Sequence, residues 1–200
     1  MARKDKRALI LVASEKVFRN KRYHELTLDD VAKAAKVGKG TIYLYFKDKD
    51  DLVFQLALHG HDELCESIRG LTEQKNFSFR EAMIKVCTEI SAFFLGRHSL
   101  FRAIGEHEMR LHALKNKRRD EFNVHRKKLQ AAIAEILEKG RREGLIREDI
   151  DLATQAAFLL GMMRARDHAF GENPSEMPPL ELVADIFMNG FGNKVCCNEK

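Results

Sequence analysis

Apolar residues recur at helical spacing along almost the whole chain, and no stretch alternates apolar and polar residues with a period of two. An amphipathic helix places apolar side chains three and four residues apart, whereas a half-buried strand needs alternation. The pattern therefore predicts an all-α fold. Nine helices are expected, over residues 4–19, 28–35, 39–46, 48–69, 78–95, 100–114, 118–139, 151–170 and 179–189.

Two of the expected helix starts carry capping residues. Thr27 is followed three residues later by Asp30, a variant of the capping box with Asp in place of Glu. Asp48 and Asp51 repeat this spacing at the next long helix. Between these two helix starts, residues 36–38 are predicted to form a tight turn. Two short helices joined by such a turn favour a helix-turn-helix.

The positive charge of the chain is concentrated in its first quarter. Residues 1–49 hold 13 basic and 6 acidic residues, a net charge of +7, whereas residues 50–200 hold 22 basic and 24 acidic residues, a net charge of −2. A basic cluster favours a polyanionic partner, with nucleic acid first, although a solvated basic face would give the same count. We therefore expect a DNA-binding domain over 1–49 and a second domain over 50–200 that does not itself wrap DNA.

Composition narrows the class of protein further. A hydrophobic content of 44% is too high for a disordered chain. No run approaches 18 uncharged apolar residues, so no membrane span is expected. The four cysteines form no C-x-x-C pair, and the charged N-terminus does not resemble a secretory signal. These features favour a cytoplasmic protein.

The second helix of the expected helix-turn-helix carries side chains suited to DNA: Lys39, Thr41, Tyr43 and Tyr45, with Lys47 just after it. Lysine can neutralise a phosphate or reach a guanine edge, and hydroxyl groups can donate to phosphate oxygens. The two tyrosines have an alternative place in the core. A basic N-terminal arm is a further candidate for DNA contact: Arg3, Lys4, Lys6 and Arg7.

The segment from Leu26 to Leu52 resembles the DNA-binding signature of the tetracycline-repressor (TetR) family. The matching residues are Thr27 in the second helix, Lys39, Gly40, Thr41, Tyr43, Tyr45 and Phe46 in the recognition helix, and Lys49 and Leu52 in the fourth helix. Residues 140–151 resemble a connector that the family often carries before its eighth helix. The resemblance implies a homodimeric transcriptional regulator, in most cases a repressor, whose C-terminal domain binds a small molecule and thereby changes the separation of the two DNA-reading heads.

The DNA-binding residues predicted on this basis are Thr27, Lys36, Lys39, Gly40, Thr41, Tyr43, Tyr45 and Lys47. Two positions depart from the family pattern. Lys36 stands where the family usually has glycine, and in a left-handed conformation it would cost roughly 1 kcal/mol. Gly38 replaces the usual serine cap, which costs roughly a few tenths of a kcal/mol. Lys36 is also a candidate for an additional phosphate contact.

The second domain is rich in Phe and Met at helical spacing, which suits either a packed core or an adaptable ligand pocket. The candidates for lining a pocket are Phe94, Met109, Phe158, Met162 and Arg166. Arg166 could hold an anionic effector, or it could pair with Asp167 or with a partner subunit. The effector itself is an unidentified small molecule, and no cofactor is expected.

The last expected helix, over 179–189, is apolar on more than one face. A helix of this kind needs two neighbours. We therefore expect it to pack with the helix over 151–170 across a two-fold axis, which forms a homodimer by four-helix packing.

No catalytic or metal site is expected. The sequence from His107 to His112 has one residue too many for the zinc-protease motif, so its two histidines lie about 140° apart around a helix. Pairs such as His61 and Cys65 offer only two ligands. The alternatives that remain are a helical metal-binding or enzymatic protein and a non-specific architectural DNA binder.

Overall fold

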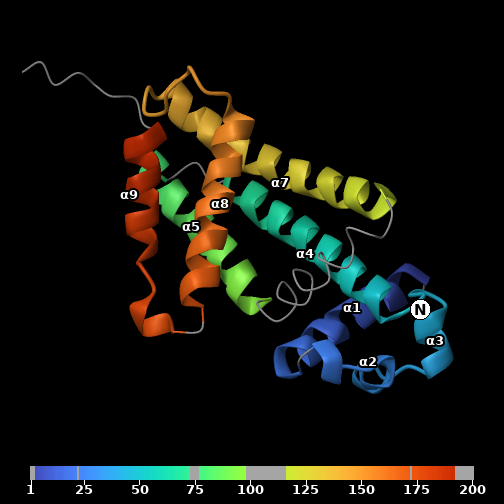
Figure 1. Cartoon of the computed structure of the whole chain (residues 1–200). Helices are drawn as coiled ribbons and strands as arrows, with labels where there is room; N and C mark the ends of the chain where they lie inside the picture. Colours follow the sequence, from blue (N-terminus) through green and yellow to red (C-terminus); the bar gives the residue numbers. More distant parts are fainter. Residues whose placement is uncertain (1–2, 22, 73–76, 98–115, 172, 192–200) are drawn as a thin grey trace, which may run out of the picture. The chain divides into compact units, whose positions relative to one another are not determined.

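The computed structural model describes residues 3–21, 23–72, 77–97, 116–171 and 173–191. Within these ranges all regular structure is helical and there is no β-strand, so the all-α prediction is confirmed (Figure 1). The α-helices are α1 (Arg3–Asn20), α2 (Leu28–Ala34), α3 (Lys39–Tyr43), α4 (Lys49–Thr72), α5 (Phe79–Gly96), α7 (Asn116–Arg142), α8 (Leu152–Phe170) and α9 (Leu180–Phe191). Two short 3-10 helices span Tyr23–Glu25 and Pro174–Glu176. The helix predicted over 100–114 lies outside the described residues.

The described residues divide into two compact units. The first contains those of 1–62 and 96–123, and the second contains those of 63–95 and 124–200. Both α4 and α7 therefore contribute to each unit. The division predicted between residues 49 and 50 was placed where the net charge changes, and it stays a prediction. The packing of the chain groups the first turns of α4 with the first unit.

The first unit has one apolar core built from α1, α2, α3 and the start of α4. Its most deeply buried side chains are Ile10, Leu11, Leu26, Val31, Ile42, Phe46, Leu52 and Leu56. The helical stripe of α1 supplies two of them, and the short helices α2 and α3 supply one each. Neither α2 nor α3 is long enough to be stable alone, so this shared core must hold them.

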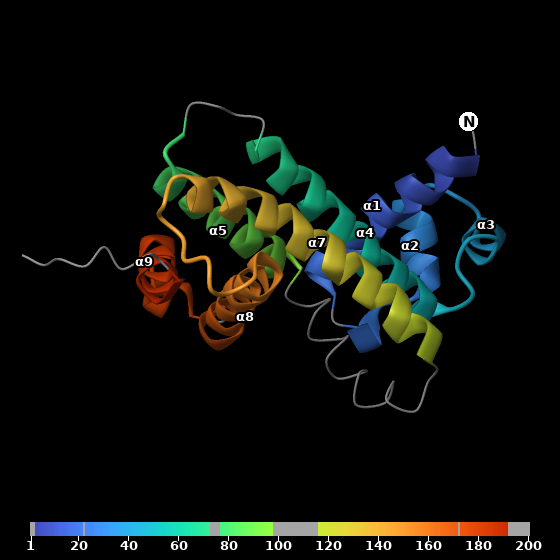
Figure 2. The same ribbon diagram turned by 90° about the horizontal axis from the view of Figure 1, so that it is seen from above.

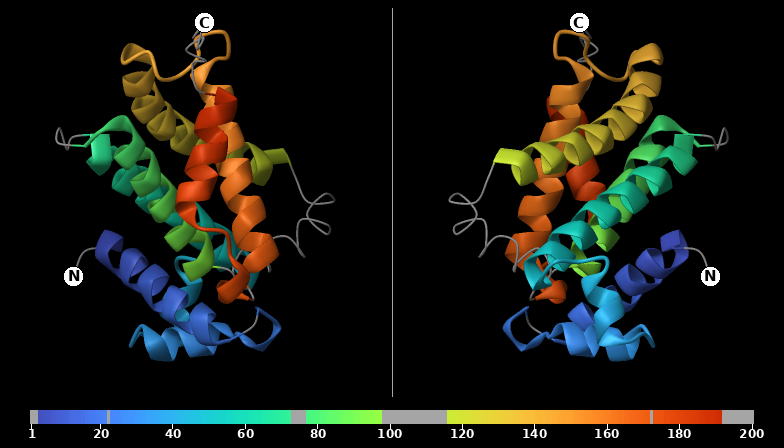
Figure 3. Two further views of the ribbon diagram at one scale, coloured as in Figure 1. Left: turned by 90° about the vertical axis from the view of Figure 1, so that its left-hand side faces the viewer. Right: turned by 90° about the vertical axis from the view of Figure 1, so that its right-hand side faces the viewer.

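The second unit is built around helix α5, which buries eight of its 18 residues, with α8 and α9 lying antiparallel and side by side (Figures 1 and 3). Its parts of α4 and α7 run in the same direction (Figure 2), and an ion pair joins Arg69 to Glu135 at 3.8 Å. A Cβ at Gly140 would lie 2.5 Å from the ring of Phe79. Glycine is therefore required where α7 crosses α5.

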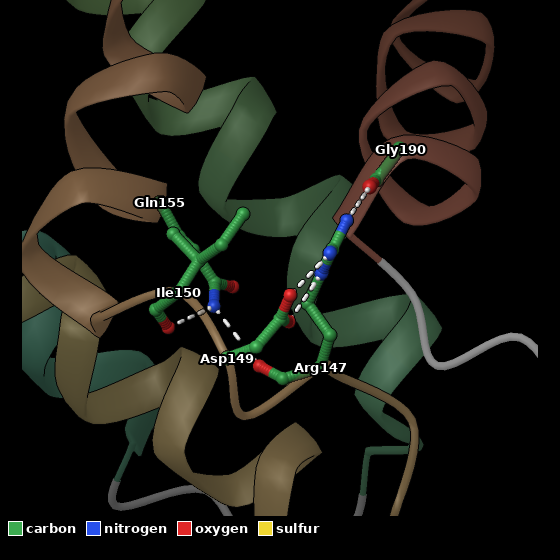
Figure 4. A network of polar contacts seen from close by, with 5 residues as sticks. All are labelled: Arg147, Asp149, Ile150, Gln155 and Gly190. Atoms are coloured by element: carbon green, nitrogen blue, oxygen red, sulfur yellow. Dashed lines mark hydrogen bonds and ion pairs between the residues drawn. The ribbon is translucent and has the colours of Figure 1, made fainter.

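The connector between α7 and α8 is held by hydrogen bonds that side chains donate to backbone carbonyls and to a carboxylate (Figure 4). The buried amide of Gln155 donates from Nε2 to the carbonyl oxygens of Arg147 at 3.1 Å and Ile150 at 2.8 Å. The guanidinium of Arg147 donates to both carboxylate oxygens of Asp149, and this pairing raises the pKa of Arg147. Gly144 supplies the left-handed residue of the preceding turn, with φ of 71°.

Candidate nucleic-acid interface

The start of α2 is fixed by the predicted capping box. The Thr27 hydroxyl accepts from the Asp30 backbone N–H at 3.2 Å, and the Thr27 backbone N–H donates to Asp30 Oδ2 at 3.0 Å. Lys21 lies 2.9 Å from the other Asp30 oxygen. The hydrogen bond from Lys21, followed by those from Thr27, lowers the pKa of Asp30 to about 2. Thr27 therefore sets where α2 begins, whatever contact it makes with DNA.

The turn between the two short helices is a Schellman motif with a lysine at its left-handed position. The Val37 N–H donates to the Ala32 carbonyl at 3.0 Å, and the Lys36 N–H donates to the Lys33 carbonyl at 3.2 Å. These two bonds satisfy carbonyl groups at the end of α2. Lys36 has φ of 53°, so it adopts the left-handed conformation that was considered for it from the sequence. Its side chain is exposed.

Helix α3 presents one face to the core and another to solvent. Ile42 and, just after the helix, Phe46 are completely buried. Tyr43 is 52% exposed and Leu44 is 72% exposed. The helix ends at Tyr43, three residues before the predicted end, because the chain continues as turns in which Leu44 and Tyr45 donate to the carbonyls of Thr41 and Ile42.

Lys39 opens α3 and is engaged by an acidic residue of α2. Its Nζ donates to Asp29 Oδ2 at 2.9 Å, and both side chains are about half exposed to solvent. The hydrogen bond that Lys39 donates to Asp29 raises the pKa of Lys39. Asp29 therefore favours the charged form of Lys39 at the solvent-facing side of the helix.

The remaining candidates fall into two groups. Lys36, Gly40 and Lys47 are exposed, and a Cβ at Gly40 would have no atom within 4 Å, so that position leaves room for a DNA backbone. Thr41 is half-buried, and Tyr45 packs against the first unit's core, as the alternative interpretation of this tyrosine expected. That these residues contact DNA stays a prediction.

Arg7, one of the candidates in the basic N-terminal arm, is held within the first unit. It lies in α1, where it donates to Gln55 Oε1 at 2.5 Å and its guanidinium lies 5.9 Å from the ring centre of Phe46. An arginine held over a core aromatic ring is not free to follow DNA. Lys6 also lies within α1, whereas the side chains of Arg3 and Lys4 lie outside those described.

Two residues of this surface were not identified from the sequence. Leu44 is an exposed apolar side chain beside Tyr43, and an apolar group there suits the methyl group of thymine. Asp29 pairs with Lys39 across the turn. A ten-residue separation through a turn gives no helical or strand spacing, so only the folded turn shows that these two charges meet.

Among the pocket candidates of the second unit, Phe94 and Met162 are half-buried, and Met109 lies outside the described residues. Phe158 is 55% exposed. The buried face of α8 carries Gln155, Ala156, Leu159, Met163 and Asp167, and Phe158 lies on the opposite face. The expectation that Phe158 lines an internal pocket is therefore not supported by its position.

Arg166 forms the ion pair that the alternative interpretation expected. Its Nη1 donates to Asp167 Oδ1 and, at 3.0 Å, to the Ser91 hydroxyl, while its Nε donates to the Pro178 carbonyl at 2.6 Å. Burial raises the pKa of Asp167. Burial also raises the pKa of the Cys87 thiol to about 12, which keeps that thiol protonated. An anion-binding role for Arg166 would have to compete with Asp167, and it stays a prediction.

The described residues contain no group of three or more potential metal ligands, and no helix among them has the length and apolar character to cross a membrane. His61 is buried and its Nδ1 lies 2.8 Å from the Ala57 carbonyl oxygen. The His107–His112 sequence lies outside the described residues.

Comparison with known proteins finds matches to the helix-turn-helix segment and to nearly the whole chain. Residues 10–56 match the family of bacterial regulatory proteins described as the tetR family. The chain is 25% identical over 188 residues to a fatty acid metabolism regulator protein of Bacillus subtilis, which covers 92% of this chain and 95% of that protein. Over residues 10–56 the chain has the DNA-binding segment of the TetR family. The protein is a DNA-binding transcriptional regulator.

Solved structures share the fold over nearly the full length. A TetR-family regulator of Mesorhizobium loti has a TM-score of 0.73 at 21% identity and covers 96% of this chain and 97% of its own. The regulator FadR of Bacillus subtilis, solved in complex with stearoyl-CoA, has a TM-score of 0.63 at 22% identity and covers 91% and 95%. At these identities the likeness shows the fold alone.

Proposed function

We propose that this TetR-family regulator is a repressor that binds a palindromic operator as a homodimer and is released by a small-molecule effector. The observation that carries the proposal is the α2–turn–α3 surface. The inner side of this surface packs on the core of the first unit, and its exposed side carries Tyr43, Lys36 and Lys47. A helix held in this way can enter a major groove while flanking lysines contact phosphates.

The homodimer is proposed to form through α8 and α9. Phe158 on α8 and Leu182 and Ile186 on α9 are each about half exposed, although all three are large and apolar. Large apolar side chains exposed on two adjacent helices are typical of an interface. Two copies related by a two-fold axis would join these faces into a four-helix bundle.

The effector is proposed to be a long-chain acyl thioester. The support is the near full-length similarity to the Bacillus subtilis fatty acid metabolism regulator and the shared fold with FadR bound to stearoyl-CoA. Half-buried Phe94 and Met162 in the second unit suit an acyl chain, because both are apolar and methionine adapts its shape.

The test uses a DNA fragment that the full chain selects from genomic DNA, labelled for fluorescence anisotropy. Replacing Tyr43 by Ala should weaken binding at least about tenfold, because one hydrogen bond to a charged phosphate contributes about 1.5–3 kcal/mol. Stearoyl-CoA should release the DNA, whereas coenzyme A alone should not. Equal affinity for the parent and the Tyr43 variant would reject the interface, and equal affinity with and without stearoyl-CoA would reject the effector class.

A further inference from the structure

The first lysine of the recognition helix already has an anionic partner in the free protein. Lys39 Nζ lies 2.9 Å from Asp29 Oδ2. The other oxygen of this carboxylate, Oδ1, is covered by protein and has no hydrogen-bond partner among the described residues. Asp29 therefore offers a single outward oxygen, and Lys39 occupies it.

This arrangement has the chemistry of a lysine–phosphate contact. A carboxylate oxygen and a phosphate oxygen are both anionic acceptors for an ammonium group, and Lys39 lies at the start of the helix that is proposed to approach DNA. The ammonium group has three donors on a flexible stem, so its position depends on the partner available. An operator phosphate that binds Lys39 must do so in competition with Asp29 or beside its negative charge.

We propose that Asp29 limits operator affinity by holding Lys39 in an internal ion pair that DNA must exchange. Asp29 thereby acts as a positioning residue, because it acts on DNA through Lys39. This inference rests on the proposed function, in which α3 contacts the operator.

The exchange has a signature in the salt dependence of binding. When Lys39 neutralises a phosphate, one counterion is released from DNA. In the parent protein the abandoned Asp29 carboxylate takes up a cation at the same moment, which cancels that release. Without the carboxylate the release is not cancelled, so the slope of log K against log salt should become steeper by about 0.9 for each head.

The experiment compares Asp29→Asn, Lys39→Gln and the double variant by anisotropy over a range of salt concentrations. An exposed ion pair contributes about 0.2–1 kcal/mol, so Asp29→Asn should tighten binding by about 1.4- to fivefold for each head at low salt. In the Lys39→Gln background, Asp29→Asn should change neither the affinity nor the slope. Glu25→Gln serves as a charge-matched control in the same unit, and its effect should be the same in both backgrounds.

Two results would overturn the proposal. One is an Asp29→Asn variant that binds no more tightly than the parent, and the other is equal tightening with and without Lys39, which would indicate general repulsion between Asp29 and DNA. Because Asp29 lies in the first turn of α2, thermal melting checks that each variant is folded, and Asp29→Ser provides a second neutral residue suited to a helix start. Failure of the proposed function looks different, because the parent chain would then select no DNA site.

Discussion

Replacing Lys36 by Gly should stabilise the first unit and weaken its DNA binding. Lys36 has φ of 53° and an exposed side chain, and the two hydrogen bonds of its turn are made by backbone atoms. Glycine would keep both bonds. A non-glycine residue in the left-handed region costs about 1–2 kcal/mol, and the greater freedom of glycine in the unfolded chain returns about 0.5–1 kcal/mol of this. We expect a net gain of about 0.5–1 kcal/mol.

The matched control is Lys36→Ala, which removes the charge but keeps the Cβ and its strain. The chain has no tryptophan, and its three tyrosines, at positions 23, 43 and 45, all belong to the first unit. Tyrosine fluorescence during urea unfolding therefore reports on this unit alone. Equal midpoints for the Gly and Ala variants would refute the assignment of strain to Lys36.

The same pair of variants tests the phosphate contact of Lys36. If the amine neutralises a phosphate, both variants should reduce the magnitude of the salt slope by about 0.9 for each head, because both lack the charge. Unchanged slopes in both would show that Lys36 does not reach DNA, while leaving the stability argument intact.

Two further predictions concern charged groups with fixed partners. Asp167→Ala should lower the free energy of unfolding by about 3 kcal/mol, because it leaves the largely buried guanidinium of Arg166 without its counterion. The loss should be smaller in an Arg166→Met background. Far-UV circular dichroism in urea measures both losses, and equal losses in the two backgrounds would contradict the pairing. The depressed pKa of Asp30 means that its contribution to stability is present above pH 3.8 and is lost as the pH falls towards about 2. An acid titration followed by tyrosine fluorescence should show that loss in the parent but not in Asp30→Asn, and identical acid profiles would contradict it.

The sequence predicted those parts of the interface that depend on local chemistry. The capping box at Thr27 and Asp30 and the tight turn at Lys36 involve residues within a few positions of one another, so their spacing was sufficient. Val31 and Ile42, which are completely buried, are among the apolar residues that recur at helical spacing. Of the residues that the family resemblance assigned to DNA, Lys36, Gly40 and Tyr43 are exposed, whereas Tyr45 packs against the core.

The errors concern contacts that only the folded chain brings together. Arg7 was a candidate for DNA contact as part of a basic N-terminal arm, but α1 brings it to Gln55, nearly fifty residues away, with its guanidinium 5.9 Å from the ring centre of Phe46. Phe158 was grouped with other large apolar residues by type, although the buried face of α8 is set by Leu159 and Met163. Residue type predicts that a side chain is apolar, and only its helix face decides whether it meets the core or another protein.

The charge of the first 49 residues, +7 in total, overstates how many cations this surface offers to DNA. Several of those cations already have partners within the unit: Arg7 with Gln55, Lys21 with Asp30, Lys39 with Asp29 and Lys49 with the carbonyls of Tyr23 and Leu26. Among the predicted DNA contacts, Lys36 and Lys47 have no side-chain partner in the described part of the chain. Counterion release should therefore follow these two lysines, with Lys39 contributing only after exchange, and a head with two such contacts gives a salt slope of roughly −2 rather than the roughly −6 that its net charge would suggest. Net charge attracts the head to DNA from a distance, and the internal ion pairs decide how many of those charges then bind phosphates.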